Sequence, residues 1–136
     1  MNKNFNGWMT LKNSIHNSGS RPGYKTREVW WVSIGRNVGF EEDGKGKFYN
    51  RPVLILRGFS KEFFLGIPLS HTSNRGKYYH DFIMNGKVSV ALLSQMRAFD
   101  TLRLISKCGM ISIQDFNNIK KKCITIINDE PINKKS

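Results

Sequence analysis

The chain of 136 residues carries 22 lysine and arginine residues against 10 aspartate and glutamate residues, a formal net charge of +12. This length fits one domain, and 39% of the residues are hydrophobic, too many for a basic disordered tail. No stretch reaches the ~20 apolar residues of a membrane helix, and the first residues lack the apolar core of a signal peptide. We therefore expect a folded cytoplasmic domain whose charge favours a polyanionic partner such as nucleic acid.

Cysteine and histidine are too few and too scattered for a metal site or a disulfide scaffold. Cys108 and Cys123 are the only cysteines, and both lie in apolar patterns, so we expect them in the core. His16, His71 and His80 show neither the paired spacing nor the cysteine partners of zinc sites. We expect no metal and no cofactor.

The first 26 residues form an extension of the main domain, which we expect to span 27–136. Apolar residues recur at helical spacing: Phe5, Trp8, Leu11 and Ile15. This pattern predicts an amphipathic helix over 5–16, ended by the Gly- and Pro-containing run 17–23. The helix either packs Trp8 on the main body or acts as a lid or a partner-binding arm.

Beyond Glu28 the sequence predicts short strands. The expected strands are 28–34, 51–57, 63–69, 78–84, 88–93 and 102–106. Asn85 and Gly86 predict a tight hairpin because both residues tolerate positive φ. The short strands and Gly-rich turns indicate a mainly β fold with helices, in which a small bent sheet or barrel forms the body.

A C-terminal helix is predicted to begin after Ser112. Ser112 and Asp115 have the spacing of a capping box, and Ile111 can pack on Phe116. The predicted buried stripe contains Phe116, Ile119, Cys123, Ile126 and Ile127. Residues Lys120 to Lys122 are expected on the solvated face.

The Gly-rich loop 35–50 is the first candidate for chemistry. It holds three acidic residues in a basic chain and leads directly to Arg51. An arginine at this position suits phosphate binding because its guanidinium is a rigid fork of donors. A surface loop closed by an ion pair is the alternative interpretation.

The second candidate is the polar segment that follows the strand predicted over 63–69. Ser70 and His71 place a hydroxyl and an imidazole at a strand end, where they either bind a phosphate and move a proton or satisfy a local turn. Arg75, Lys77 and Tyr78 combine cations with aromatic rings, as RNA-binding surfaces do.

The third candidate is the polar cluster of Gln95, Arg97 and Asp100. It comes just after the apolar strand predicted over 88–93. The arginine either contributes to a binding surface or closes a local salt bridge with Asp100.

In this order, these segments resemble the MazF/PemK/Kid family of toxin endoribonucleases. The segment Arg27-Glu-Val-Trp-Trp-Val is similar to the family's first strand. The other similar segments are Gly39-x-Glu41 with Arg51-Pro52-Val, then Pro68-Leu-Ser70, and last Gln95-Met-Arg97-Ala-Phe-Asp100-x-x-Arg103-Leu. The resemblance spans about residues 27–127.

The resemblance implies an SH3-like or CcdB-like barrel with a C-terminal helix, to which this chain adds its N-terminal helix. It implies a homodimer that cleaves single-stranded mRNA without metal, by attack of the ribose 2′-OH on the adjacent phosphate. The products are a cyclic phosphate and a 5′-OH. The implied partner is a cognate acidic antitoxin whose disordered segment fills the RNA groove.

The resemblance also assigns roles to residues. Arg51 stabilises the phosphorane, and Ser70 hydrogen-bonds a non-bridging oxygen. Glu41 or His71 takes the 2′-OH proton, and both remain open. The residues expected to bind RNA are Arg75, Lys77, Tyr78, Gln95 and Arg97, of which the last two support the fold or the groove rather than bond breaking.

The sequence departs from the family at two functional positions. Ser70 replaces a threonine, and Leu92 and Ser94 stand where some relatives have an Arg-x-Asp pair. These departures support a non-catalytic RNA-binding module as one alternative function. A gyrase inhibitor of the CcdB type, which shares the implied fold and needs no cleavage, is the other. Arg51-Pro52 together with Pro68-Leu-Ser70 favours the ribonuclease.

Overall fold

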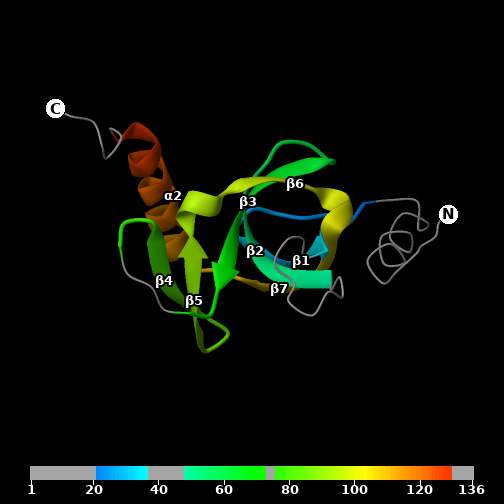
Figure 1. The fold of residues 1–136 in the computed structure, drawn as a ribbon, viewed down its shortest axis with the longest axis horizontal. Helices are drawn as coiled ribbons and strands as arrows, with labels where there is room; N and C mark the ends of the chain where they lie inside the picture. Colours follow the sequence, from blue (N-terminus) through cyan, green and yellow to red (C-terminus); the bar gives the residue numbers. More distant parts are fainter. Residues whose placement is uncertain (1–20, 37–47, 73–75, 130–136) are drawn as a thin grey trace.

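Seven strands and one long helix make up the described part of the chain. The computed structural model describes residues 21–36, 48–72 and 76–129 (Figure 1). The expected helix over 5–16 and the central part of the Gly-rich loop lie outside these residues. The elements are β1 (Glu28–Arg36), β2 (Phe48–Gly58), β3 (Phe63–Ser70), β4 (Tyr79–Met84), β5 (Lys87–Leu92), η1 (Leu93–Gln95), β6 (Arg97–Asp100), η2 (Thr101–Arg103), β7 (Leu104–Met110) and α2 (Ile113–Asn128), where η marks a 3-10 helix.

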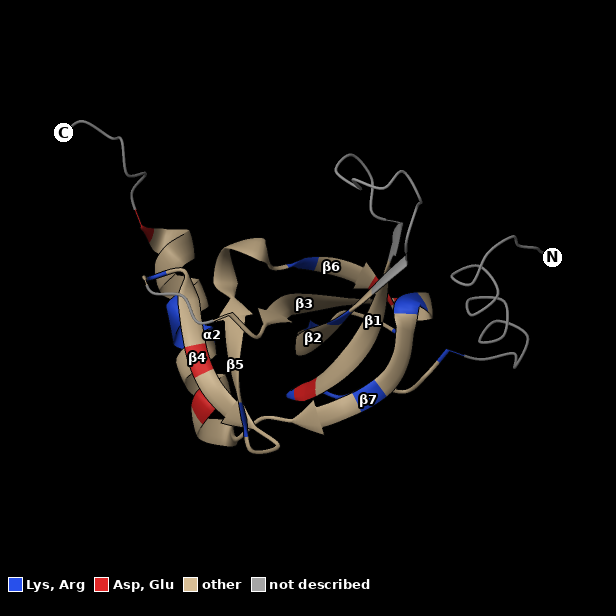
Figure 2. Ribbon diagram, turned by 60° about the horizontal axis from the view of Figure 1, so that its bottom comes forward, with Lys and Arg blue, Asp and Glu red and all other residues tan. Residues whose placement is uncertain are grey.

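The strands form one bent sheet in which β3 takes part twice. The strand order is β4-β5-β3-β2-β1-β7, and β6 pairs with β3 beside this path. Residues 63–66 of β3 pair with β6, whereas its last two residues pair with β5. Because β6 continues through η2 into β7, which pairs with β1, the strands close into a small barrel (Figure 2). The expected mainly β barrel with a C-terminal helix is confirmed.

Two hydrophobic clusters lie on the two faces of this sheet. One fills the barrel and contains Trp30, Val32, Val53, Ile55, Phe64, Phe99 and Leu104. The other joins the sheet to α2 and contains Val29, Leu54, Ile67, Leu69, Phe82, Met84, Ala91, Leu93, Ile111, Phe116, Ile119 and Cys123. Successive strand residues point to opposite faces, so β1 to β3 need apolar side chains on both sides. This requirement explains the uninterrupted apolar run of β2.

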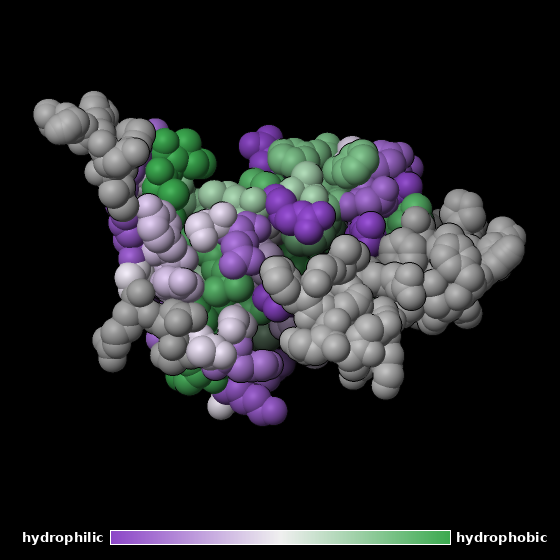
Figure 3. All heavy atoms as spheres, in the orientation of Figure 1, coloured by the Kyte–Doolittle hydropathy of each residue, from purple (hydrophilic) through white to green (hydrophobic). Residues whose placement is uncertain are grey.

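The helix α2 begins where the sequence predicts. The Ser112 Oγ accepts a hydrogen bond from the Asp115 N–H at 3.0 Å. The predicted buried stripe is confirmed for Phe116, Ile119 and Cys123, and Ile126 is half-buried, but Ile127 is 69% exposed. The prediction for Ile127 is wrong because Ile126 already faces the sheet and the next residue is turned by about 100°. Its side chain contributes to an apolar surface at the end of the helix (Figure 3).

Several element boundaries differ from those expected. The Asn85-Gly86 hairpin is confirmed, with φ of 55° and 78°. In contrast, β1 and β2 extend into the predicted loop, since Gly35 pairs with Tyr49 and Arg36 with Phe48. The last predicted strand, 102–106, begins only at Leu104 because residues 101–103 form η2, and it continues to Met110.

Glu28 anchors the start of β1 through a buried carboxylate. Its side chain is 8% exposed, its Oε1 accepts hydrogen bonds from Trp30 Nε1 and the Lys25 N–H, both at 2.9 Å, and its Oε2 lies 3.2 Å from Lys107 Nζ. Burial raises the pKa of Glu28, but these hydrogen bonds and the Lys107 charge outweigh it and hold the pKa below the ordinary value of 4.5.

This lowered pKa predicts a pH dependence of stability. The folded state binds the Glu28 proton less tightly than the unfolded state, so its contribution is present above pH 4.5 and is lost as the pH falls through the folded pKa. We expect Glu28→Gln to unfold about 1 to 3 kcal/mol more easily than wild type at neutral pH, and this difference to shrink in acid. Urea denaturation at several pH values measures it. Glu62→Gln, at an exposed carboxylate, is the control, and parallel pH profiles for wild type and Glu28→Gln would contradict the assignment.

Candidate active site

Arg51 and Ser70 lie at the same end of two neighbouring strands. In the antiparallel register of β2 and β3, the last pair joins Val53 to Pro68. Arg51 lies two residues before Val53 and Ser70 two residues after Pro68, so both strands carry their polar residue to the same margin of the barrel. Arg51 is exposed, and its side chain makes no hydrogen bond or ion pair within the described residues. Among the described residues, none occupies any of its five guanidinium N–H donors.

The Ser70 hydroxyl is held by the backbone that follows it. Its Oγ accepts a hydrogen bond from the Thr72 N–H at 3.0 Å, and the residue is half-buried. This is the local turn bond that the sequence leaves as an alternative. The bond occupies a lone pair of the oxygen, so the hydroxyl proton remains free to be donated to a phosphate oxygen. His71 follows directly and is exposed.

A second polar group lies farther back along β3. Arg97 pairs with Gly66 across the β3–β6 ladder, and its guanidinium carbon lies 4.6 Å from the centre of the Phe99 ring. Gln95 ends η1 and is exposed. Gly66 precedes Ser70 by four residues of β3, which corresponds to roughly 13 Å along the strand. Arg97 therefore lies beside the Arg51–Ser70 pair rather than within it.

The acidic residue of this segment has a distant partner. Asp100 Oδ1 lies 2.7 Å from Arg21 Nη1. Asp100 therefore forms an ion pair with a residue far away in the sequence, besides any contact within its own segment. Arg103 donates a hydrogen bond to the Ser33 carbonyl at 3.2 Å. Burial lowers the pKa of Arg103, and the positive charge of Arg97 lowers it further.

Ser33 is a feature of the site region that the sequence did not single out. Its hydroxyl is buried and has no hydrogen-bond partner in the described part of the chain. Ser33 faces Asn50 across β1 and β2, one step from the pair of Val32 and Arg51. The available signal was a small polar residue within the apolar strand 28–34. Because neighbouring strand residues point to opposite faces, the Ser33 side chain lies on the face opposite to that of Val32 and Arg51. Its hydroxyl is therefore a buried unsatisfied group near the site that is not directed at the candidate arginine.

The expected RNA-binding segment before β4 is joined to the end of α2. Lys77 Nζ lies 3.2 Å from Asp129 Oδ2 and 5.4 Å from the centre of the Tyr78 ring. The hydrogen bond to Asp129 raises the pKa of Lys77, which keeps this side chain cationic. Tyr78 is half-buried. No recorded contact among the described residues brings Lys77 or Tyr78 to Arg51. Arg75 and the candidate base Glu41 lie outside the described residues.

The described residues offer neither a metal-binding cluster nor a membrane-spanning helix. No group of histidine, cysteine or acidic side chains there is arranged to hold a metal ion. None of the helices described is both long and apolar enough to cross a membrane. Cys108 is half-buried and Cys123 is buried, both as free thiols, and burial raises the pKa of each.

Comparison with known families decides what this barrel is. The model of the PemK-like, MazF-like toxins of type II toxin–antitoxin systems matches residues 25–127, which is most of the chain. The chain belongs to this family. The resemblance drawn from its motifs is thereby confirmed. No curated protein sequence matches the chain.

Solved structures of MazF toxins share the fold. The Mycobacterium tuberculosis toxin MazF-mt6 has a TM-score of 0.58 at 13% identity, with 76% of this chain and 99% of that chain covered. MazF from Deinococcus radiodurans has a TM-score of 0.58 at 14% identity, with 80% and 98% covered. A mycobacterial endoribonuclease solved in complex with its cognate antitoxin has a TM-score of 0.58 at 12% identity, with 80% and 100% covered. At these identities the likeness establishes the fold.

In this PemK/MazF-like toxin, three of the four expected catalytic residues fall within the described part of the chain. Arg51, Ser70 and His71 lie at one margin of the barrel, on β2, at the end of β3 and directly after it. Gln95 and Arg97 follow the other edge of β3, and Lys77 and Tyr78 lie near the end of α2. The three expected catalytic residues therefore share one margin of the barrel, and the two other groups of expected site residues lie elsewhere on it.

Proposed function

We propose that this toxin is a metal-independent, sequence-specific endoribonuclease that cleaves single-stranded mRNA in the cytoplasm. The 2′-OH of a ribose attacks the adjacent phosphate, and the products carry a cyclic phosphate and a 5′-OH. The observation that carries the proposal is the placement of an exposed arginine without a partner among the described residues, Arg51, at the same margin as the Ser70 hydroxyl.

The chemistry needs charge stabilisation on the phosphorane, a base that takes the 2′-OH proton and an acid that gives a proton to the departing 5′-oxygen, a role for which Arg51 is the candidate. Arg51 presents a permanent positive charge and a fork of donors to the pentacoordinate phosphorane. Ser70 donates its free proton to a non-bridging oxygen, while Thr72 fixes the position of the oxygen. The base that takes the 2′-OH proton is His71 or Glu41, and His71 is exposed directly after Ser70.

The partners proposed for this toxin are a second copy of the chain and an acidic antitoxin. The family is defined by toxin–antitoxin pairs. Two of the similar structures, the mycobacterial endoribonuclease and a Deinococcus radiodurans MazE–MazF complex, contain an antitoxin. The net charge of +12 favours an acidic partner.

Cleavage of a long mRNA by the purified chain in the presence of EDTA tests the proposal. We expect fragments with 5′-OH ends, and we expect no cut where the ribose that precedes the scissile phosphate is replaced by deoxyribose. Inhibition of DNA supercoiling with intact RNA would favour a gyrase inhibitor instead. Binding of RNA without any cleavage would favour the non-catalytic module.

A further inference from the structure

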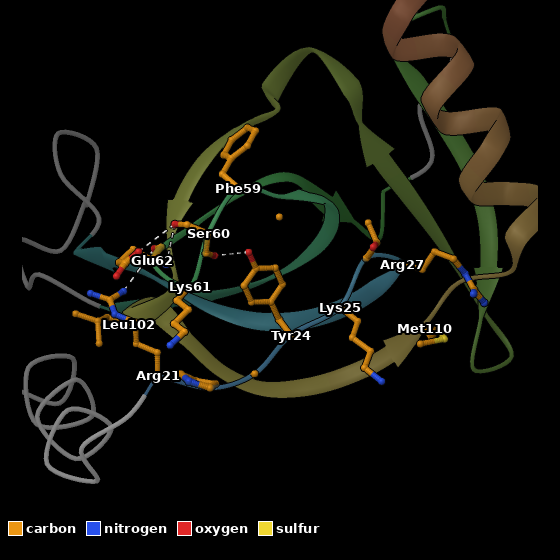
Figure 4. A pocket seen from close by; sticks show the side chains of 14 residues that line it. Arg21, Tyr24, Lys25, Arg27, Phe59, Ser60, Lys61, Glu62, Leu102 and Met110 are labelled. Atoms are coloured by element: carbon orange, nitrogen blue, oxygen red, sulfur yellow. Dashed lines mark hydrogen bonds between the residues drawn. The ribbon is translucent and has the colours of Figure 1, made fainter.

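A pocket opens at the end of the barrel that lies opposite Arg51 and Ser70. Its volume is about 1340 Å³, and its walls are residues 21–27, called the arm below, and the turn 58–62 between β2 and β3 (Figure 4). Arg51 and Gly58 lie near opposite ends of β2, roughly 20 Å apart at the rise of an extended strand. The pocket is therefore separate from the proposed cleavage site.

The arm is fixed against the barrel, so the pocket is formed before any ligand binds. The Tyr24 hydroxyl donates to the Ser60 carbonyl at 2.7 Å, and its side chain points into the space between arm and turn (Figure 4). A Cβ on Gly58 would lie 2.5 Å from the Tyr24 hydroxyl, so glycine is needed for this contact. At the start of the arm, Arg21 Nη1 lies 2.7 Å from Asp100 Oδ1.

The pocket offers free positive charge on both walls. Lys25 and Lys61 are exposed, and neither ammonium group has a hydrogen-bond or ion-pair partner in the described part of the chain. Figure 4 shows both side chains extending in the same direction, one from the arm and one from the turn. Glu62 is the acidic residue of the lining, and its Oε1 accepts a hydrogen bond from Ser60 Oγ. Two cations are therefore left for an anionic ligand.

An exposed aromatic ring lines the same pocket, on the side that faces away from the two lysine side chains (Figure 4). Phe59 lines the pocket and is 56% exposed, a large fraction for a phenylalanine. Lysines that pair with phosphates and a ring on which a base stacks are the two elements of single-strand recognition. A nucleotide supplies a negative charge and an aromatic face together, whereas an acidic residue of a peptide supplies the charge alone. The chemistry of the pocket thus favours RNA over an acidic peptide.

We propose that this pocket binds the part of a single-stranded RNA that flanks the cleaved bond. Lys25 and Lys61 pair with two phosphates, and Phe59 stacks on a base. This inference rests on the proposed function in that the same RNA strand passes Arg51. It adds a second contact on the toxin surface, which increases affinity for long substrates without taking part in bond breaking.

Binding of an uncleavable strand tests the pocket. The probe is a fluorescent single strand that extends from Arg51 to the pocket, with deoxyribose at the scissile position, and its affinity is measured over a range of salt concentrations. Each phosphate contact on a single strand contributes about 0.7 to the slope of log affinity against log salt. The double variant Lys25→Gln, Lys61→Gln is therefore expected to reduce this slope by about 1.4. Phe59→Ala is expected to weaken binding roughly fivefold or more.

A matched pair of lysines elsewhere controls for net charge. Lys87 and Lys121 are exposed on β5 and α2 and do not line the pocket, so Lys87→Gln, Lys121→Gln removes the same charge elsewhere on the surface and is expected to leave the slope unchanged. An unchanged slope in the pocket variant, or an equal decrease in the control variant, would overturn the proposal. Normal RNA binding by the Lys25→Gln, Lys61→Gln variant, together with loss of its binding to a poly-glutamate peptide, would also overturn the proposal. Because the probe is not cleaved, a wild-type chain that fails to cut RNA would contradict the proposed function without changing this result.

Discussion

Replacing Arg51 with alanine is expected to reduce the rate of RNA cleavage by about 100-fold or more, the range seen when a preorganised donor to a developing negative charge is removed. Arg51 is exposed and has no partner within the described residues, so the barrel does not depend on it. The free energy of unfolding of the Arg51→Ala variant should differ from that of wild type by no more than about 0.5 kcal/mol. The rate is measured on a labelled RNA in EDTA, and stability by urea denaturation of the same preparation.

Arg57 provides the matched control because it is an exposed arginine near the other end of the same strand, β2. Arg57→Ala removes the same charge and should retain most of the activity. Arg51→Lys keeps the charge but loses the planar fork, so we expect a rate between those of Arg51→Ala and wild type. Equal activity of Arg51→Ala and Arg57→Ala would remove Arg51 from the mechanism.

Ser70→Ala is expected to lower the cleavage rate by roughly 10- to 100-fold, the effect of one hydrogen bond to a charged group. The rate falls because alanine cannot donate the hydroxyl proton to the phosphate oxygen. In wild type this proton is free, since the Thr72 N–H bonds to a lone pair of the Ser70 Oγ. The variant should fold normally, because Ser70 is only half-buried and its hydroxyl closes a local turn. Single-turnover cleavage at saturating enzyme concentration separates this effect from weaker RNA binding.

Ser70→Thr distinguishes the hydroxyl from the rest of the side chain. It restores the residue usual in the family, and its branched side chain holds the hydroxyl in fewer rotamers. We expect this variant to cleave RNA at least as fast as wild type. Wild-type rates in Ser70→Ala would show that the hydroxyl has no role in the reaction.

The sequence was informative where local pattern decides structure. The apolar runs of β2 and β3 predict two strands, and the short turn between them makes the pair antiparallel, which is why Arg51 and Ser70 lie toward the same end of the two strands. The Asn85-Gly86 turn and the Ser112 cap are likewise local signals whose geometry depends on few neighbours.

Features that depend on distant partners were not predictable in the same way. β6 has only four residues and no alternation of its own, and it becomes a strand because residues 63–66 of β3 offer it a ladder. The ion pair of Arg21 with Asp100 joins residues that no local pattern relates, and so does that of Lys77 with Asp129. The pocket could not be predicted for the same reason, since its two walls, the arm and the turn, are far apart in the sequence.

The position of β1 has a consequence for how the toxin is made. β1 lies between β2 and β7, so Trp31 pairs with Pro52 on one side and with Ser106 on the other. During synthesis, β1, β2 and β3 leave the ribosome first and carry both Arg51 and Ser70 with them. The barrel cannot close until β7 arrives in the last third of the chain, because one edge of β1 has no partner before then. A growing chain therefore carries Arg51 and Ser70, the two residues proposed for catalysis, in an unfinished scaffold, and the proposed cleavage site is completed only after most of the message that encodes it has been translated.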